Sequence, residues 1–182
     1  REKEVLDRVE EILRDANRRN EKVLREVAEI IRTVIEDNKR VLKEVADELR
    51  RVLEELRDKV KDKDRIKKLE EEIRKLLDEL RRSSDKVTKE SEELLRRLEE
   101  SSRRDSEKSK RLLDRLEELV RRGDGRVEEM EDVVRRSLDH SRRNVEEAKK
   151  AVTKVVEDNK DNVRRIKEVV ARVVEKAREE AR

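Results

Sequence analysis

The chain has 182 residues, of which 57% are charged, and it contains no Phe, Tyr, Trp, Pro or Cys. Its 53 Lys and Arg nearly balance its 50 Asp and Glu. A nucleic-acid-binding protein would concentrate basic residues on one face and would usually add aromatic residues for base stacking, and this sequence shows neither feature. Without cysteine it has no disulfide or thiolate metal site, and its longest apolar run, residues 169–171, is too short to cross a membrane. High charge is typical of disorder, but here the apolar third recurs regularly among strong helix formers, which predicts helices.

The first predicted helix covers residues 1 to about 60. From Leu6 to Val60, 54 residues hold 15 steps between apolar or small positions, a mean spacing of 3.6 residues. This is the period of a straight α-helix and not the 3.5 of a left-handed coiled coil. The pattern recurs every 18 residues, as at Val9, Val27 and Val45. Since 18 residues make about five turns, each repeat returns to the same face of the helix.

Two short breaks divide the chain. The first, residues 61–64, is polar and out of period, and Asp62 or Asp64 can cap a second helix at about 65–122. At the second break, Gly123 suits the left-handed residue after a helix end, and Asp124 suits the N-cap of a third helix at 126–182. Loops this short make neighbouring helices antiparallel. The sequence therefore predicts an all-α, up-down-up bundle of three long, nearly straight helices, forming one domain over 1–182.

Polar side chains interrupt the apolar faces of all three predicted helices. Folding the chain at its two loops brings these side chains to two common levels, about 27 Å apart along the axis. We predict that the first polar layer holds Asn17, Asn20, Ser102, Ser106, Ser109, Ser137, His140, Ser141 and Asn144. We predict that the second polar layer holds Asn38, Ser84, Thr88, Ser91, Asn159 and Asn162. Ser101 widens the first layer, and Ser83 widens the second.

Specificity is a physical reason for such layers. A buried amide without a partner costs about 1–3 kcal/mol, so a helix shift that separates polar partners is penalised where apolar contacts would tolerate it. The alternative is that the serines are ordinary exposed positions. The repeat argues against this for Ser84, which aligns with the apolar Ile66. Thr88 and Ser106 align with Glu70, so the alternative stays open for them.

Several features occur together over all 182 residues: the 18-residue repeat, the absence of aromatics, the Lys/Arg/Glu surface, the Gly-Asp-Gly loop and the polar layers. The repeat is plain where residues 19–34, RNEKVLREVAEIIRTV, align with residues 37–52, DNKRVLKEVADELRRV. In these features the chain resembles de novo designed, parametrically generated helical bundles with buried hydrogen-bond networks. The resemblance implies a hyperstable, soluble protein with no natural compartment, expected in the cytoplasm of an expression host.

The candidate chemistries are weak. His140 is the single histidine, whereas a di-carboxylate metal site in a bundle needs a Glu-x-x-His motif from each of two helices. His140, Asp105 and Ser106 could be drawn as a triad, but a helix presents no nucleophile turn and no free amides for an oxyanion hole. Asp105 is either a member of the first layer or tilted to solvent. Residues 122–124 spell the Arg-Gly-Asp tripeptide of cell adhesion, but helix capping already accounts for Gly123 and Asp124. We expect no enzymatic activity, no metal and no cofactor.

Three functions are weighed. The first is a structural scaffold without natural biochemical activity, whose polar layers specify helix register and pairing and which requires no partner. The alternative is a component of a homo- or hetero-oligomer with itself or a designed helical partner, or a switch that a competing peptide displaces. Extra apolar residues on the first helix favour the alternative, although a helix touching two neighbours also needs them: Ile12, Ala28, Ile30, Ile35 and Leu53. The third, a lipid-surface helix, would need aromatics and a basic polar face, so we expect no membrane and no nucleic acid as partners.

Overall fold

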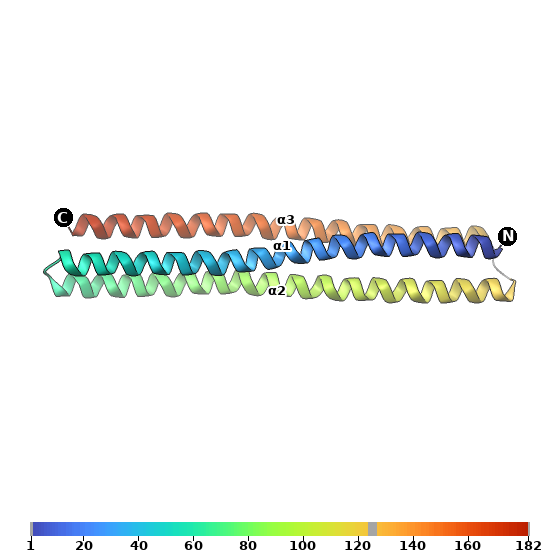
Figure 1. The fold of residues 1–182 in the computed structure, drawn as a ribbon, viewed down its shortest axis with the longest axis horizontal. Helices are drawn as coiled ribbons and strands as arrows, with labels where there is room; N and C mark the ends of the chain where they lie inside the picture. Colours follow the sequence, from blue (N-terminus) through green and yellow to red (C-terminus); the bar gives the residue numbers. More distant parts are fainter. Residues whose placement is uncertain (1, 124–126, 182) are drawn as a thin grey trace. The chain divides into compact units, whose positions relative to one another are not determined.

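The computed structural model describes residues 2–123 and 127–181, and three long helices account for nearly all of them (Figure 1). They are α1 (Glu2–Lys59), α2 (Lys63–Arg122) and α3 (Val127–Glu180). The helices pack against one another and the described residues contain no strand, which confirms the predicted all-α three-helix bundle. Of the predicted bounds, two differ by two residues: α2 begins at Lys63 and not at 65, and α3 ends at Glu180 and not at 182.

Both ends of α2 follow the predicted capping residues. The backbone N–H of Asp64 donates to Asp62 Oδ1 over 3.0 Å, so Asp62 is the N-cap of α2. Gly123 follows α2 with a φ of 72°, and its N–H donates to the carbonyl oxygen of Val120 over 3.1 Å. A residue with a side chain is strained at this φ, which explains the glycine. The predicted cap Asp124 lies outside the described residues.

The chain groups into two compact units, and each contains a segment of all three helices. Unit 1 comprises residues 1–30 and 93–153, and unit 2 comprises residues 31–92 and 154–182. The boundaries fall within the helices and not at the loops. The expectation of a single domain over 1–182 stays a prediction. The two predicted polar layers fall one in each unit.

The apolar core of unit 1 draws on all three of its helix segments. Its buried members are Val9 and Leu13 of α1, Leu116 of α2, and Met130 and Val134 of α3. The spacing of four residues within α1 and α3 places each pair on one face of its helix. The polar layer of unit 1 begins four residues after Leu13, so it continues the same face of α1.

The apolar core of unit 2 is larger. Its buried members are Val41, Val45, Leu49, Val52, Leu56, Leu69, Ile73, Leu80, Ile166, Val170, Val174 and Ala177. On α1 these residues recur at intervals of three or four, which keeps them on one stripe. The polar layer of unit 2 adjoins this core, because Asn38 precedes Val41 by one turn and Ser84 follows Leu80 by one turn.

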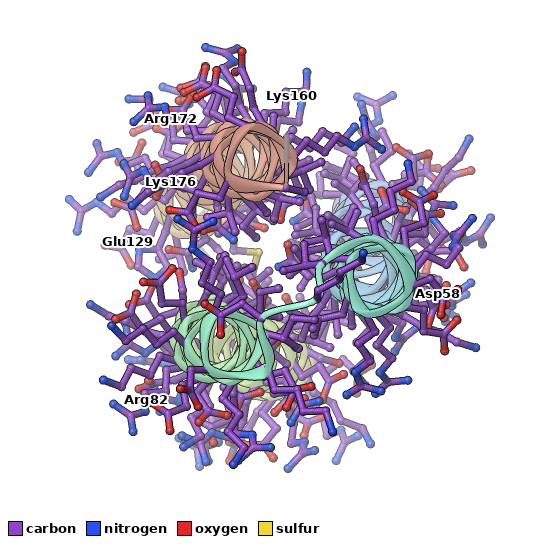
Figure 2. All side chains as sticks on the ribbon, turned by 90° about the vertical axis from the view of Figure 1, so that its left-hand side faces the viewer. Asp58, Arg82, Glu129, Lys160, Arg172 and Lys176 are labelled. Atoms are coloured by element: carbon purple, nitrogen blue, oxygen red, sulfur yellow. The ribbon has the colours of Figure 1, made fainter. Side chains whose placement is uncertain are left out.

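Charged side chains cover the outer faces of the helices. Figure 2 shows the labelled Arg82, Lys160 and Arg172 pointing away from the helices that carry them. Ion pairs within one helix, such as Arg97 with Glu93 at 3.0 Å, are exposed and contribute little to the free energy of folding. Along the described helices, no stretch has both the length and the apolar character that a membrane span requires.

Candidate functional site

In unit 1, polar side chains of α1 reach both neighbouring helices. Ser109 Oγ of α2 donates a hydrogen bond to Asn17 Oδ1 over 3.3 Å. Asn20 Nδ2, almost one turn further along α1, donates to Ser141 Oγ of α3. Ser109 is buried, and the other three residues are half-buried. These amides and hydroxyls thus link residues that are far apart in the sequence at one level of the bundle.

The third contact in this layer joins α2 to α3. Asn144 Nδ2 donates to both carboxylate oxygens of Asp105, at 3.2 and 3.1 Å. The half-buried Asp105 therefore has an amide partner, which resolves the two alternatives left by the sequence in favour of the polar layer. With this contact and the two contacts of α1, every pair of helices in unit 1 is joined by a side-chain hydrogen bond.

Two residues predicted in the first layer do not belong to a buried layer. Ser106 and His140 are exposed, and these two predictions are wrong. Ser106 is displaced by about 100° around its helix from the half-buried Asp105, and His140 is displaced by the same angle from the half-buried Ser141. Ser102 and Ser137 are half-buried. No group of three or more His, Cys, Asp or Glu that could hold a metal occurs among the described residues.

A small cavity of about 30 Å³ adjoins the contact between Asp105 and Asn144. Asn17, Asn20 and Ser102 also line it. This volume suits one or two water molecules, whereas pockets for small-molecule ligands measure about 300–1,000 Å³. The cavity is therefore a feature of the polar layer and offers no room for an organic substrate.

In unit 2, the polar layer is more deeply buried. The exposed fractions are 1% for Asn38, 4% for Ser84, 1% for Ser91 and 7% for Asn159. Thr88 and Asn162 are half-buried. The Ser91 hydroxyl donates to the carbonyl oxygen of Val87 in its own helix over 2.8 Å, so it needs no partner from α1 or α3.

The direct polar contact in this layer runs from α2 to α3, and it lies at the edge of the layer. Ser83 is exposed, and its Oγ donates to Asn162 Oδ1 over 3.1 Å. Within the described chain, five buried polar atoms of the layer have no hydrogen-bond partner: Asn38 Nδ2, Asn38 Oδ1, Ser84 Oγ, Asn159 Oδ1 and Asn162 Nδ2. The two layers therefore differ: direct bonds join all three helices in unit 1, whereas Asn38 of unit 2 is buried without a protein partner.

No protein-family model, curated protein or solved structure matches the chain. Its function is inferred from the contacts of its own residues.

A carboxyl pair between α1 and α2 of unit 1 escaped the sequence reasoning. A side-chain hydrogen bond with Glu117 raises the pKa of Glu10, and burial of Glu10 and the negative charge of Glu117 raise it further. The positive charge of Arg14 lowers the pKa of Glu10, and the negative charge of Asp7 raises it. Two features of the sequence could have indicated this pair. Both glutamates adjoin core residues, Glu10 next to Val9 and Glu117 next to Leu116, and they lie at similar levels of antiparallel helices.

This pair predicts a pH dependence. Because the pKa of Glu10 is raised in the folded state, its stabilising contribution is complete below the pKa of an unfolded glutamate, about 4.3. It is lost as the pH rises through the folded pKa of Glu10. We expect Glu10→Gln, which keeps a hydrogen-bond donor without a charge, to flatten this part of the pH dependence and to stabilise the protein slightly at pH 7.

Chemical denaturation of the parent and the variant between about pH 4 and pH 7 measures the effect. Glu11→Gln, at an exposed neighbouring position, is the control. Parallel stability curves for the parent and Glu10→Gln over this range would contradict the role of the pair.

Proposed function

We propose that the chain is a structural scaffold whose two polar layers set the register of its three helices, with no substrate chemistry of its own. The observation that supports this most is the set of contacts in unit 1, where each helix pair has a polar link at one level: Asn17 with Ser109, Asn20 with Ser141, and Asp105 with Asn144. In this arrangement the polar side chains bond to one another across the helices, and these pairs do not surround a site for a reacting ligand.

Register is what such links control. Apolar positions recur every three or four residues, so a helix that slides by one turn, about 5.4 Å, still finds apolar neighbours. The same slide separates Asn20 from Ser141 and Asn144 from Asp105. Each hydrogen bond lost in this way removes about 0.5–1.5 kcal/mol, and a polar group that ends up buried without a partner costs about 1–3 kcal/mol. Polar layers therefore penalise wrong registers, as a single buried Asn does in coiled coils.

A slide by a whole 18-residue repeat is the hardest error to exclude, because it brings one polar layer against the other. Three pairs of equivalent positions differ in polarity between the layers: Asn17 and Ile35, Asp105 and Val87, Ser137 and Val155. In such a slide Val87 replaces Asp105 as the neighbour of Asn144, and the amide loses its acceptor. These differences give each layer its own partners.

The sequence resemblance extends this proposal to origin. The uniform repeat, the aromatic-free composition and the paired polar layers favour a designed helical bundle. A design of this kind is expected to be hyperstable, with its helical circular dichroism retained above about 90 °C. A cooperative loss of helix at the temperatures usual for natural domains, about 45–65 °C, would count against this part of the proposal.

The test of the scaffold proposal is the Asn20 contact. We expect Asn20→Ala to lower the free energy of unfolding by about 1–3 kcal/mol, because Ser141 loses its partner and the amide volume is removed. Guanidinium denaturation measures the change, and Lys22→Ala, at an exposed position of α1, is the control.

A double-mutant cycle with Ser141→Ala separates the contact from general effects of truncation. If the two residues act as a pair, the double variant loses less stability than the sum of the single variants. Additive losses, or an Asn20→Ala effect no larger than that of Lys22→Ala, would refute a register-setting role for this contact.

One observation favours the alternative, a component of an oligomer or of a displaceable assembly. Ile12 and Ile30 of α1 are 41% and 43% exposed, and their spacing of 18 residues places them on the same side of the helix in unit 1. The other extra apolar residues of α1, Ala28, Ile35 and Leu53, are half-buried within their own units. Light scattering with a mass measurement at increasing concentration distinguishes the two functions. A mass that rises and is restored by Ile12→Lys with Ile30→Lys supports the alternative.

A further inference from the structure

The unpartnered atoms of the polar layer in unit 2 include both hydrogen-bond donors and hydrogen-bond acceptors. Two are carbonyl oxygens, of Asn38 and Asn159, and accept hydrogen bonds. Two are amide nitrogens, of Asn38 and Asn162, and donate, while the Ser84 hydroxyl can do either. A native protein holds few such atoms, and each costs about 1–3 kcal/mol if it stays unpaired. The set therefore needs a partner that can donate and accept at once.

These atoms come from all three helices and lie near one level of unit 2. The hydrogen bond from Ser83 to Asn162 fixes α2 against α3 at this level. Ser84 is the next residue of α2, and Asn159 lies three residues before Asn162, almost one turn away. On α1, Asn38 lies one turn before Val41, and on α2, Ser84 lies one turn after Leu80. Because Val41 and Leu80 belong to the same apolar cluster, Asn38 and Ser84 border the same end of that cluster.

Water has the hydrogen-bonding capacity that this set requires. A water molecule donates twice and accepts twice, and proteins bury about one water per 27 residues, typically with about three hydrogen bonds to polar groups that have no other partner. We propose that unit 2 binds a buried water molecule between Asn38, Ser84 and Asn159. The water donates to Asn38 Oδ1 and Asn159 Oδ1, and it accepts from the Ser84 hydroxyl and an amide N–H of the layer.

The bound water supplies the link that Asn38 otherwise lacks. In unit 1, Asn17 and Asn20 of α1 bond directly to α2 and α3. In unit 2, the water joins Asn38 of α1 to Ser84 of α2 and Asn159 of α3. Because these three side chains are 1–7% exposed, the water exchanges with solvent only when the helices open locally. It is therefore an integral part of the core and resides longer than surface water.

Nuclear magnetic resonance of the whole chain, labelled with ¹⁵N, tests the proposal. We expect cross-peaks between the water signal and the Asn38 side-chain NH₂, with opposite signs in NOE and ROE spectra, the signature of a long-lived dipolar contact. Proton exchange with solvent gives the same sign in both spectra. A crystal structure should show a water within hydrogen-bond distance of Asn38 Oδ1 and Asn159 Oδ1.

Two buried variants provide matched controls. Asn38→Leu keeps the number and branching of the side-chain heavy atoms, removes both polar atoms and should abolish the water contacts at Asn159. Ser91→Ala should leave the water in place, because the Ser91 hydroxyl bonds within its own helix. The proposal is overturned if the Asn38 NH₂ shows no dipolar water contact. It is equally overturned if the crystal structure shows Asn38 and Asn159 bonded directly to each other with no water between them.

Discussion

Replacing the buried polar residues of unit 2 with apolar ones, as Asn38→Leu, Ser84→Ala and Asn159→Leu together, is expected to raise the free energy of unfolding by roughly 3 kcal/mol or more. Each of these side chains carries at least one buried atom without a protein partner. Their desolvation costs about 1–3 kcal/mol per group, and a bound water recovers only part of it. Leucine has the same number and branching of side-chain heavy atoms as asparagine, so the apolar core of unit 2 can continue through the layer.

Guanidinium denaturation measures the gain, and Ser91→Ala is the control because its hydroxyl is already paired within α2. Asn38→Ala alone is expected to destabilise the protein, because it leaves a cavity and removes a partner from the layer without filling the space. A combined variant that unfolds more easily than the parent would show that the layer stabilises the fold outright.

The gain in stability should come with a loss of specificity. An apolar layer accepts any apolar neighbour, so helices displaced by one turn or contributed by another chain are penalised less. We expect the combined variant to populate oligomers in light scattering that the parent does not form at the same concentration. If the combined variant behaves in this way, Asn38 lowers the stability of the parent and favours one defined register.

The sequence was sufficient for the helices, for the residues at both ends of α2 and for the level of the polar residues that bond in unit 1, because these follow from periodicity, local capping rules and loop length. Asp62 caps α2 and Gly123 takes a positive φ, since capping and left-handed backbone depend on residues next to them in the chain. The pairing of Asn20 with Ser141 also follows from counting residues around the two loops. Periodicity and loop length together determine which residues share a level.

What counting could not provide is the direction of each side chain at its level. Ser106 and His140 share the level of the first layer, but the step of about 100° from Asp105 and from Ser141 leaves both of them exposed. The hydrogen bond from Asn144 to Asp105 depends on rotamers that no repeat encodes. The Glu10 and Glu117 pair was missed because like charges are not expected to face each other unless one holds a proton.

The second large effect concerns the difference between the layers. Changing Asn17→Ile, Asp105→Val and Ser137→Val gives the first layer the residues that the second carries at equivalent positions. We expect this triple variant to associate between chains and to show a higher, concentration-dependent mass than the parent. In the parent, a helix of another chain that is displaced by 18 residues leaves Asn144 opposite Val87, without the acceptor that Asp105 provides. In the variant, Asn144 lacks that acceptor in both registers, so the native register loses its advantage.

The loops hold the native register within one chain, because three residues between α1 and α2 cannot span a displacement of about 27 Å. Pairing between chains has no such restraint, so the displaced register should appear as staggered oligomers. The matched control is Ser106→Thr with His140→Asp, which also copies residues of the second layer but at exposed positions, and should leave the mass unchanged. If the triple variant keeps the mass of the parent across the concentration range, the three polar differences do not discriminate registers. In that case the apolar contacts and the loops alone are enough to define the alignment of the helices.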